Sequence, residues 1–266
     1  ARRASQLKKK LANTEQKNKK SFDFLPVAVI LMVLLIWQAI VLLFAIPKYI
    51  LPAPTAVIEA LIEDGELLLS HALVSLGEAL LGFVLAVIAG IISGVLMGLF
   101  EPVRRALYPI FVITQTIPTI VLAPLFAVWF GFGLLPKVLI VILVCFFPVA
   151  VTFTQGLIKT DESMEQLMQV MGAGKWKTFC AVRVPQAIPS LFSGLKIAAT
   201  YSILGAVLSE WVGAKMGLGI LMTRAMSSFK TTLLFADVLV IVVLSLGVYK
   251  FIELLERKVA KKYISF

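Results

Sequence analysis

Charged residues are scarce in this chain of 266 residues. Only 15% of the residues are Asp, Glu, Lys or Arg, and 60% are hydrophobic, whereas a soluble domain usually carries about 25% charged residues. The hydrophobic residues also come in unbroken blocks, and a helix of roughly 20 apolar residues crosses the ~30 Å hydrocarbon core of a membrane. The composition therefore excludes an ordinary soluble domain and predicts an all-α, polytopic membrane protein.

Cysteine and histidine are nearly absent, at two residues and one residue. Cys145 falls in an apolar block and Cys180 in a polar connector, so we expect no disulfide, and no spacing suits a metal or other cofactor. We interpret His71 as a structural side chain near a helix end. Because no Ser/His/Asp set or carboxylate pair is arranged for hydrolysis inside the apolar blocks, we expect no catalytic residue.

Six apolar blocks predict six transmembrane helices. They cover about residues 27–46, 73–99, 110–130, 138–157, 190–209 and 233–252. Residues 56–69 predict a short amphipathic helix on the outer surface, too short and too acidic to span. We expect residues 101–105 to form a short inside loop, residues 131–136 an outer turn, and residues 213–230 a glycine-rich outer loop.

Basic residues are distributed unevenly between the two sides of this topology. Nineteen Lys and Arg fall on the side of the termini and five on the other side. Since cytoplasmic loops are rich in Lys and Arg, both termini and a polar segment at residues 159–189 are predicted to be cytoplasmic. The tail at residues 1–20 holds eight of these residues, and it either fixes orientation or binds lipid head groups. The net charge of +10 then requires no nucleic acid.

Small residues recur at every fourth position of the second block. Such spacing places them on one helix face, where another backbone can approach closely. We expect tight packing inside the bundle, with a dimer face as the alternative. The residues are Gly82, Ala86, Gly90, Gly94 and Gly98.

The third block is interrupted by Pro118 and Pro124, and the fourth contains Pro148. Proline at membrane depth frees backbone carbonyls, which neighbouring groups or cavity water must satisfy. This favours a pore lining, although a kinked packed helix remains open. Lys196 lies within the fifth block and either snorkels or pairs structurally, or serves the pathway. Glu78 and Glu210, at the outer ends of two blocks, are expected to be solvated or at the pore mouth.

The polar connector predicts a short cytoplasmic helix over residues 163–171. Asp161, Glu162 and Ser163 suit its N-terminus, where acids meet the positive end of the helix dipole. The stripe of Met164, Leu167, Met168 and Met171 suits a groove on another protein, with a lipid-lying helix as the alternative. Lys175 follows two glycines, yet the phosphate-loop pattern fails, because Trp176 and Gln169 replace required residues.

The residues of the polar connector also resemble a known sequence motif. The spacing of Gly172, Pro185 and Pro189, with Phe179 and Val182 between them, resembles the cytoplasmic loop of binding-protein-dependent ABC importer permeases. That loop usually reads E-A-A-x-x-x-G, whereas this chain has Gln166-Leu167-Met168 in the first three places. The resemblance covers nearly all of residues 21–266.

Further motifs are similar to the nitrate/sulfonate/taurine branch of this family. They are Ile117-Pro118-Thr119, Ala123-Pro124-Leu125, Trp129-Phe130-Gly131 and Ser209-Glu210-Trp211. Within that branch, residues 192–211 look most like permeases for thiamine pyrimidine precursors or riboflavin.

The resemblance implies a type I ABC importer permease fold in the bacterial inner membrane, with a transmembrane domain at residues 21–266 that includes the coupling segment. It further implies a homodimeric pore, two ATPase subunits on the cytoplasmic side and an extracytoplasmic solute-binding protein. The implied coupling residues are Gln166, Leu167, Met168, Met171, Gly172, Ala173 and Gly174. The candidate pathway residues are Thr114, Gln115, Thr119, Thr152, Gln155, Lys196, Tyr201 and Glu210.

The implied activity is ATP-driven import without ATP hydrolysis by this chain itself. The expected solute is a thiamine pyrimidine precursor or a similar N-heterocycle, with sulfonate or taurine, nitrate or bicarbonate as alternatives. An ion-coupled secondary carrier would more often place acids at mid-span, and a purely structural anchor would not need interrupted spans. Both of these classes stay open.

Overall fold

The computed structural model describes residues 24–263, with the backbone alone for residues 260–263. The basic tail predicted at residues 1–20 lies outside the described residues. Every regular element between residues 24 and 263 is a helix, which confirms the all-α class. The chain divides into two units, residues 1–56 and 57–266, and each is described by itself.

The first unit contains helix α2 (Phe24–Leu43), predicted as residues 27–46. Val41 is its one buried residue, and a helix that is apolar all round suits a lipid environment. The Gln38 side chain bonds Thr55 twice: its Nε2 donates to the Thr55 Oγ1, and its Oε1 accepts from the Thr55 N–H, both at 3.3 Å. These bonds hold the proline-containing turn that follows α2.

The second unit contains the other predicted spans. Three are single long helical runs: α4 (Gly65–Leu99), α7 (Leu134–Ile158) and α12 (Thr231–Tyr263). A fourth run, Lys175–Glu210, ends in α10 (Val184–Glu210). The interrupted third span is a pair, α5 (Glu101–Thr114) and α6 (Thr119–Phe130), bent by 96°. Together with α2, these four helical runs and the bent pair account for the six predicted spans within the described residues.

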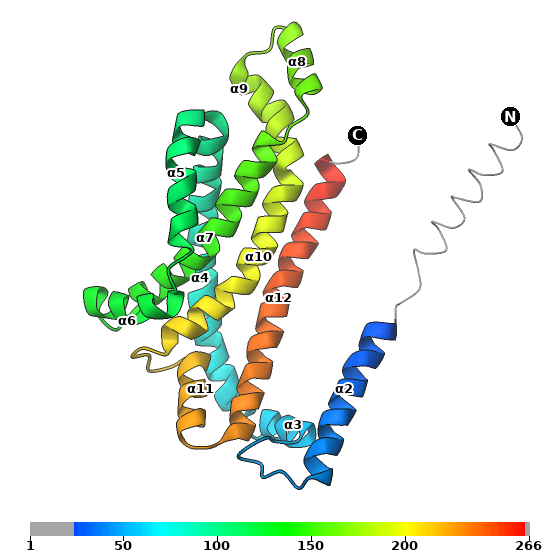
Figure 1. The fold of residues 1–266 in the computed structure, drawn as a ribbon, viewed down its shortest axis with the longest axis vertical. Coiled ribbons are helices and arrows are strands. Elements are labelled where there is room, and N and C mark those ends of the chain that lie inside the picture. The colour runs from blue at the N-terminus through cyan, green and yellow to red at the C-terminus, as the bar shows by residue number, and fades with distance from the viewer. Residues whose placement is uncertain (1–23, 264–266) are drawn as a thin grey trace, which may run out of the picture. The chain divides into compact units, whose positions relative to one another are not determined.

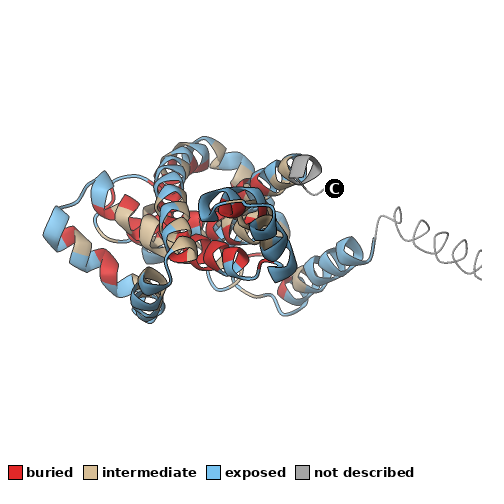
Figure 2. Cartoon of the chain, turned by 90° about the horizontal axis from the view of Figure 1, so that it is seen from above, coloured by how far each residue is buried: buried red, intermediate tan, exposed pale blue. Residues whose placement is uncertain are grey.

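The long helices of the second unit lie side by side, with α7 packed against α4 and α10, and α10 also against α12 (Figure 1). Their shared core is built from residues such as Ala79, Val141, Cys145, Ala198 and Ile203, none of which is exposed. Figure 2 shows the buried positions gathered where these helices face one another. Apolar side chains around the outside remain exposed, as expected for helices that face lipid.

The small residues of α4 pack directly against α7, which confirms the expectation of tight packing in the bundle. A Cβ added to Gly82, Gly90 or Gly94 would lie 2.5–2.9 Å from Val141, Val149 or Phe153 of α7. The contacts advance in step along both helices, so α4 and α7 run parallel. Any larger side chain on this face of α4 would force the two backbones apart.

Two local predictions were wrong, and two were right in part. A short helix is present where residues 56–69 predict one, as α3 (Pro54–Glu63), but the last predicted residues belong to α4, because Leu68 is buried against α11 and α12. Residues 101–105 form the start of α5, where Pro102 is tolerated because the first helical N–H groups have no partner. The outer loop at residues 213–230 contains a helix, α11 (Leu218–Ser227). The turn at residues 131–133 is present, but Pro136 lies in the first turn of α7.

The second unit has two distinct ends. Helices α8 (Glu162–Val170) and α9 (Lys175–Thr178) project at one end, where α12 also finishes, and α11 lies at the other (Figure 1). We refer to these as the α8 end and the α11 end. The sequence predicts that the coupling segment and the C-terminal end of the chain lie on the same side of the bundle, and this arrangement agrees with that prediction.

Candidate functional site

Helix α8 begins where the sequence predicts. The Asp161 side chain caps it by accepting the Ser163 N–H at 2.9 Å, and Glu162 and Glu165 occupy the first turn, next to the positive end of the helix dipole. The chain leaves the helix through Gly172, whose φ of +75° is readily adopted only by glycine. Ala173 and Gly174 then lead into α9.

The apolar stripe of α8 is uncovered. The exposed fraction is 47% for Met164, 54% for Leu167 and 74% for Met171, while Met168 is half-buried. No residue of α8 is buried. An apolar stripe of this kind, flanked by polar residues such as Gln166, marks a surface for another protein or for membrane.

The break between α5 and α6 opens onto a cavity. Gln115 and Thr119 lie beside the break, and Tyr201 comes from α10; all three line one cavity of about 260 Å³. Its other lining residues are Val144, Leu204, Gly205 and Leu208. Three candidate pathway residues from distant parts of the sequence are therefore neighbours in space.

Other candidate pathway residues lie elsewhere. The Thr114 hydroxyl donates to the Phe111 carbonyl at 2.7 Å, and the Thr152 hydroxyl donates to the Pro148 carbonyl at 2.7 Å. The Gln155 amide donates to the Tyr108 hydroxyl at 3.4 Å. The hydroxyls of Thr114 and Thr152 thus bond within their own helices, and the Gln155 amide bonds between α7 and α5. None of the three residues is among the described residues that line the cavity.

Lys196 is paired. Its Nζ lies 2.8 Å from the Glu256 Oε2 of α12, and both side chains are about one-quarter exposed. Of the two interpretations of Lys196, this contact favours structural pairing between α10 and α12 over a place in the pathway.

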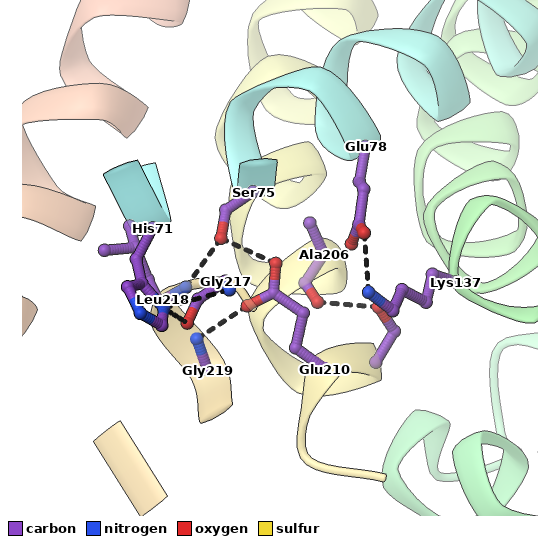
Figure 3. Close-up of polar contacts among 10 residues, drawn as sticks. His71, Ser75, Glu78, Lys137, Ala206, Glu210, Gly217, Leu218 and Gly219 are labelled. Carbon is purple, nitrogen blue, oxygen red and sulfur yellow. Dashed lines mark hydrogen bonds and ion pairs between the residues drawn. The ribbon is translucent and has the colours of Figure 1, made fainter. Parts of the chain in front are cut away.

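Glu210 lies in a buried polar network at the α11 end, and Glu78 lies beside it (Figure 3). Their exposed fractions are 0% and 6%, so the expectation of solvated side chains was wrong. The Glu210 carboxyl accepts the Ser75 hydroxyl and the Gly219 N–H, both at 2.6 Å. The network replaces the water that an acidic side chain otherwise needs.

The same network holds three consecutive residues at the start of α11. The His71 Nδ1 lies within hydrogen-bond distance of the Gly217 N–H and carbonyl, at 3.0 and 2.7 Å, and the Leu218 N–H donates to the Ser75 hydroxyl at 2.8 Å. A Cβ at Gly217 would clash with the Glu210 side chain, and a Cβ at Gly219 would clash with the Val207 carbonyl. Small residues are therefore required here, and His71 is structural, as expected.

Glu78 makes a separate ion pair with the start of α7. Its Oε1 lies 2.6 Å from the Lys137 Nζ, and both side chains are largely buried. The Glu78 Oε2 has no hydrogen-bond partner among the described residues. This pair joins α4 to α7 beside the Glu210 network (Figure 3).

Sequence reasoning missed the polar face of α4 that builds this network. His71, Ser75 and Glu78 are spaced by four and three residues, which places them on one helix face inside an apolar run. That pattern was visible in the sequence. Asp237 of α12 was also missed: it is fully buried, and neither carboxyl oxygen has a hydrogen-bond partner among the described residues.

Five long helices and a bent helix pair that breaks beside a cavity, together with an uncovered helix at the α8 end, are typical of a multi-pass transport protein. The family of binding-protein-dependent transport system inner membrane components matches residues 67–261. The chain belongs to this family and is an ABC importer permease subunit of the inner membrane.

Several relatives align over most of their length. The formylaminopyrimidine transport permease protein ThiX of Halalkalibacterium halodurans is 36% identical over 90% of this chain and 96% of its own. The riboflavin transport system permease protein RibX of Chloroflexus aurantiacus is 34% identical over 88% and 87%. The taurine transport system permease protein TauC of Escherichia coli is 28% identical over 88% of each chain.

A solved structure supports the fold. The crystal structure of an amino acid ABC transporter superposes with a TM-score of 0.61, covering 74% of this chain and 96% of that chain at 18% identity. At this identity the match establishes the fold alone, and it confirms the predicted permease architecture.

Proposed function

We propose that this permease subunit moves a thiamine pyrimidine precursor or a similar small N-heterocycle. The observation that carries the proposal is the 36% identity to a formylaminopyrimidine permease over almost the whole of both chains. The riboflavin permease, whose named solute is also an N-heterocycle, follows at 34%, and the taurine permease at 28%.

The cavity beside the α5–α6 break suits such a solute. Gln115 offers both a donor and an acceptor, and Thr119 offers a hydroxyl. The Tyr201 ring offers a flat face on which an aromatic ring can stack, and Leu204 adds apolar surface. Its volume of about 260 Å³ is just below the range for sites of drug-sized ligands, about 300–1,000 Å³, which suits a small solute.

Anionic solutes fit this cavity less well. Nitrate, bicarbonate and the sulfonate group of taurine are usually bound by Arg or Lys, and none of the seven lining residues described is cationic. Lys196, the one cation among the candidate pathway residues, is paired with Glu256. These solutes remain the alternative.

At the α8 end, the proposed partner is an ATPase subunit. The exposed stripe of Met164, Leu167 and Met171 would enter a groove on that subunit, and Gly172 would turn the chain back to the bundle. Apolar residues at i, i+3 and i+7 are the usual anchors of a helix in a groove. A second copy of this chain would complete the pore, and a solute-binding protein would deliver the solute to the α11 end.

Transport assays in proteoliposomes test the solute. The permease, its ATPase and its binding protein are reconstituted, and uptake of labelled formylaminopyrimidine is compared with uptake of taurine and nitrate. We expect uptake of the pyrimidine alone. Gln115→Leu and Tyr201→Ala should raise KM for it, whereas Thr116→Ala, outside the cavity lining, should not. Preference for taurine or nitrate would contradict the proposal.

Co-purification tests the docking helix. Leu167→Glu places a charge in the stripe and should release the ATPase subunit, whereas Gln169→Glu places the same charge off the stripe and should not. Equal retention by both variants would exclude docking through this stripe. Uptake that stops with an uncoupler while ATP stays high would instead favour an ion-coupled carrier.

A further inference from the structure

Helix α8 has little to hold it against the rest of the second unit. None of its residues is buried, and a cavity of about 570 Å³, lined by Leu99, Gln169, Lys175 and Phe179 among others, lies beside it. Apolar packing, which fixes most surface helices, is therefore weak here. Specific polar contacts must set the position of α8.

Arg183 makes the strongest of these contacts. Its Nε and Nη2 donate to the two carboxyl oxygens of Glu165 on α8, at 2.8 and 2.7 Å. A bidentate fork of this kind fixes orientation as well as distance. The Glu165 side chain is 18% exposed and that of Arg183 is 33% exposed, so water competes less than at an open surface.

The same guanidinium reaches α4. The Arg183 Nη1 donates to the Gly98 carbonyl at 3.3 Å. Gly98 lies in the last turn of α4, and the residue four places later is Pro102, which has no N–H to offer. A cation at a helix C-terminus satisfies such a carbonyl and complements the helix dipole.

Arg183 also belongs to the helical run that crosses the membrane. It ends a short π-helix, Phe179–Arg183, in which the Val184 N–H donates to the Phe179 carbonyl. This π-turn continues directly into α10. Proline at position 185 explains the widened turn, because its ring would crowd the carbonyl four residues earlier. One side chain thus joins α8, the end of α4 and the start of α10.

We propose that Arg183 is a positioning residue that transmits displacement of α8 to α4 and α10. The inference rests on the proposed docking of an ATPase subunit on α8. With the fork in place, α8 moves together with the ends of the two membrane helices. Without it, the flanking turns at Thr160 and Gly172 absorb the movement, and ATP hydrolysis continues without transport.

The test uses the complete transporter in proteoliposomes, with Arg183→Gln and the charge exchange Glu165→Arg/Arg183→Glu. The readout is the amount of solute moved per ATP hydrolysed. We expect Arg183→Gln to keep its ATPase subunits and to hydrolyse ATP, while the ratio falls at least about tenfold, the effect of about 1.4 kcal/mol of lost coupling. The charge exchange should restore part of the ratio, because it rebuilds the ion pair between α8 and the start of α10 but leaves the Gly98 carbonyl without its donor. Arg105→Gln, which removes an exposed arginine paired with Glu101 at the same end, is the control.

A distance measurement supplies a second readout that needs no transport. Spin labels at the exposed positions 162 and 100, in a chain with Cys180→Ser, report the distance from α8 to the end of α4. We expect Arg183→Gln to broaden this distribution and the charge exchange to narrow it in part, since the exchange rebuilds the ion pair but not the bond to the Gly98 carbonyl. An unchanged distribution with an unchanged transport ratio would overturn the proposal.

The two proposals fail in different ways. If the unmodified chain does not retain ATPase subunits, the proposal of docking on α8 is refuted. The spin-label distances then test by themselves whether Arg183 positions α8. If Arg183→Gln loses the ATPase subunits as Leu167→Glu does, Arg183 maintains the docking surface, and the claim of transmission is refuted.

Discussion

Replacing Glu210 should release the first turn of α11. The Glu210 carboxyl is the acceptor for two donors, the Ser75 hydroxyl and the Gly219 N–H, at 2.6 Å each. In Glu210→Ala both donors remain buried without this acceptor. Each unsatisfied buried donor costs about 1–3 kcal/mol, so the pair should cost about 2–6 kcal/mol.

The variant Glu210→Gln gives a graded comparison. It keeps the shape of the side chain and one acceptor oxygen, but its NH₂ group faces a donor in place of the second oxygen. One hydrogen bond is retained and one is lost. The expected cost is therefore about half, roughly 1–3 kcal/mol.

Hydrogen exchange over residues 213–227 measures this effect where it arises. If local opening governs exchange, each 1.4 kcal/mol gives about a tenfold acceleration. Glu210→Ala should then accelerate exchange at Gly219 at least about 30-fold, and Glu210→Gln less. Glu59→Ala, which removes an exposed carboxyl from α3, should leave it unchanged. Exchange in Glu210→Ala at the rate of the unmodified chain would refute the role of this network.

Three further predictions follow from the packing, a turn and an ion pair. Gly82→Ala should lower the free energy of unfolding by about 1–3 kcal/mol, because the added Cβ would lie 2.5 Å from Val141, and this should appear as a lower melting temperature. Gly77→Ala, with open space at its Cβ, should be neutral or stabilising in the same melting experiment. Gly172→Ala should weaken co-purification of the ATPase subunit, because a non-glycine residue at φ +75° costs about 1–2 kcal/mol. Gly174→Ala, at φ −66°, is the matched control. Equal binding by the two variants would contradict the role of the Gly172 turn in docking. Lys196→Glu should destabilise the α10–α12 contact and the added Glu256→Lys should rescue it, as read from the yield of folded protein; loss of uptake in a fully folded double variant would place Lys196 in the pathway instead.

The spans could be predicted because they depend on local composition. A run of apolar residues long enough to cross the membrane is a property of neighbouring residues, and the same is true of the four-residue spacing on α4 and of the Asp161 cap. The break in the third span was equally predictable, because Pro118 interrupts a helix wherever it lies. The 96° bend between α5 and α6 was not, since it depends on what the two halves contact.

The burial of Glu210 could not be predicted from the sequence. Its position at the end of an apolar block favours a solvated or pore-mouth side chain, yet its partners are Ser75, far earlier in the chain, and the turn that begins α11. Helix α11 was missed for a related reason: its short apolar face is buried against α3, α4, α10 and α12, which are distant in the sequence. Long-range contacts decide both features.

Contacts at its two ends fasten α10 to α4. At the α8 end Arg183, just before α10, reaches the Gly98 carbonyl, and at the α11 end Glu210 accepts the Ser75 hydroxyl. Helix α7 lies against both, held to α4 by close contacts at glycines such as Gly90. These three helices should therefore move as one body. Gln115 and Thr119 belong to the bent α5–α6 segment, which has far fewer contacts with that body. When α8 is displaced, the cavity should change shape chiefly by movement of Gln115 and Thr119 relative to Tyr201.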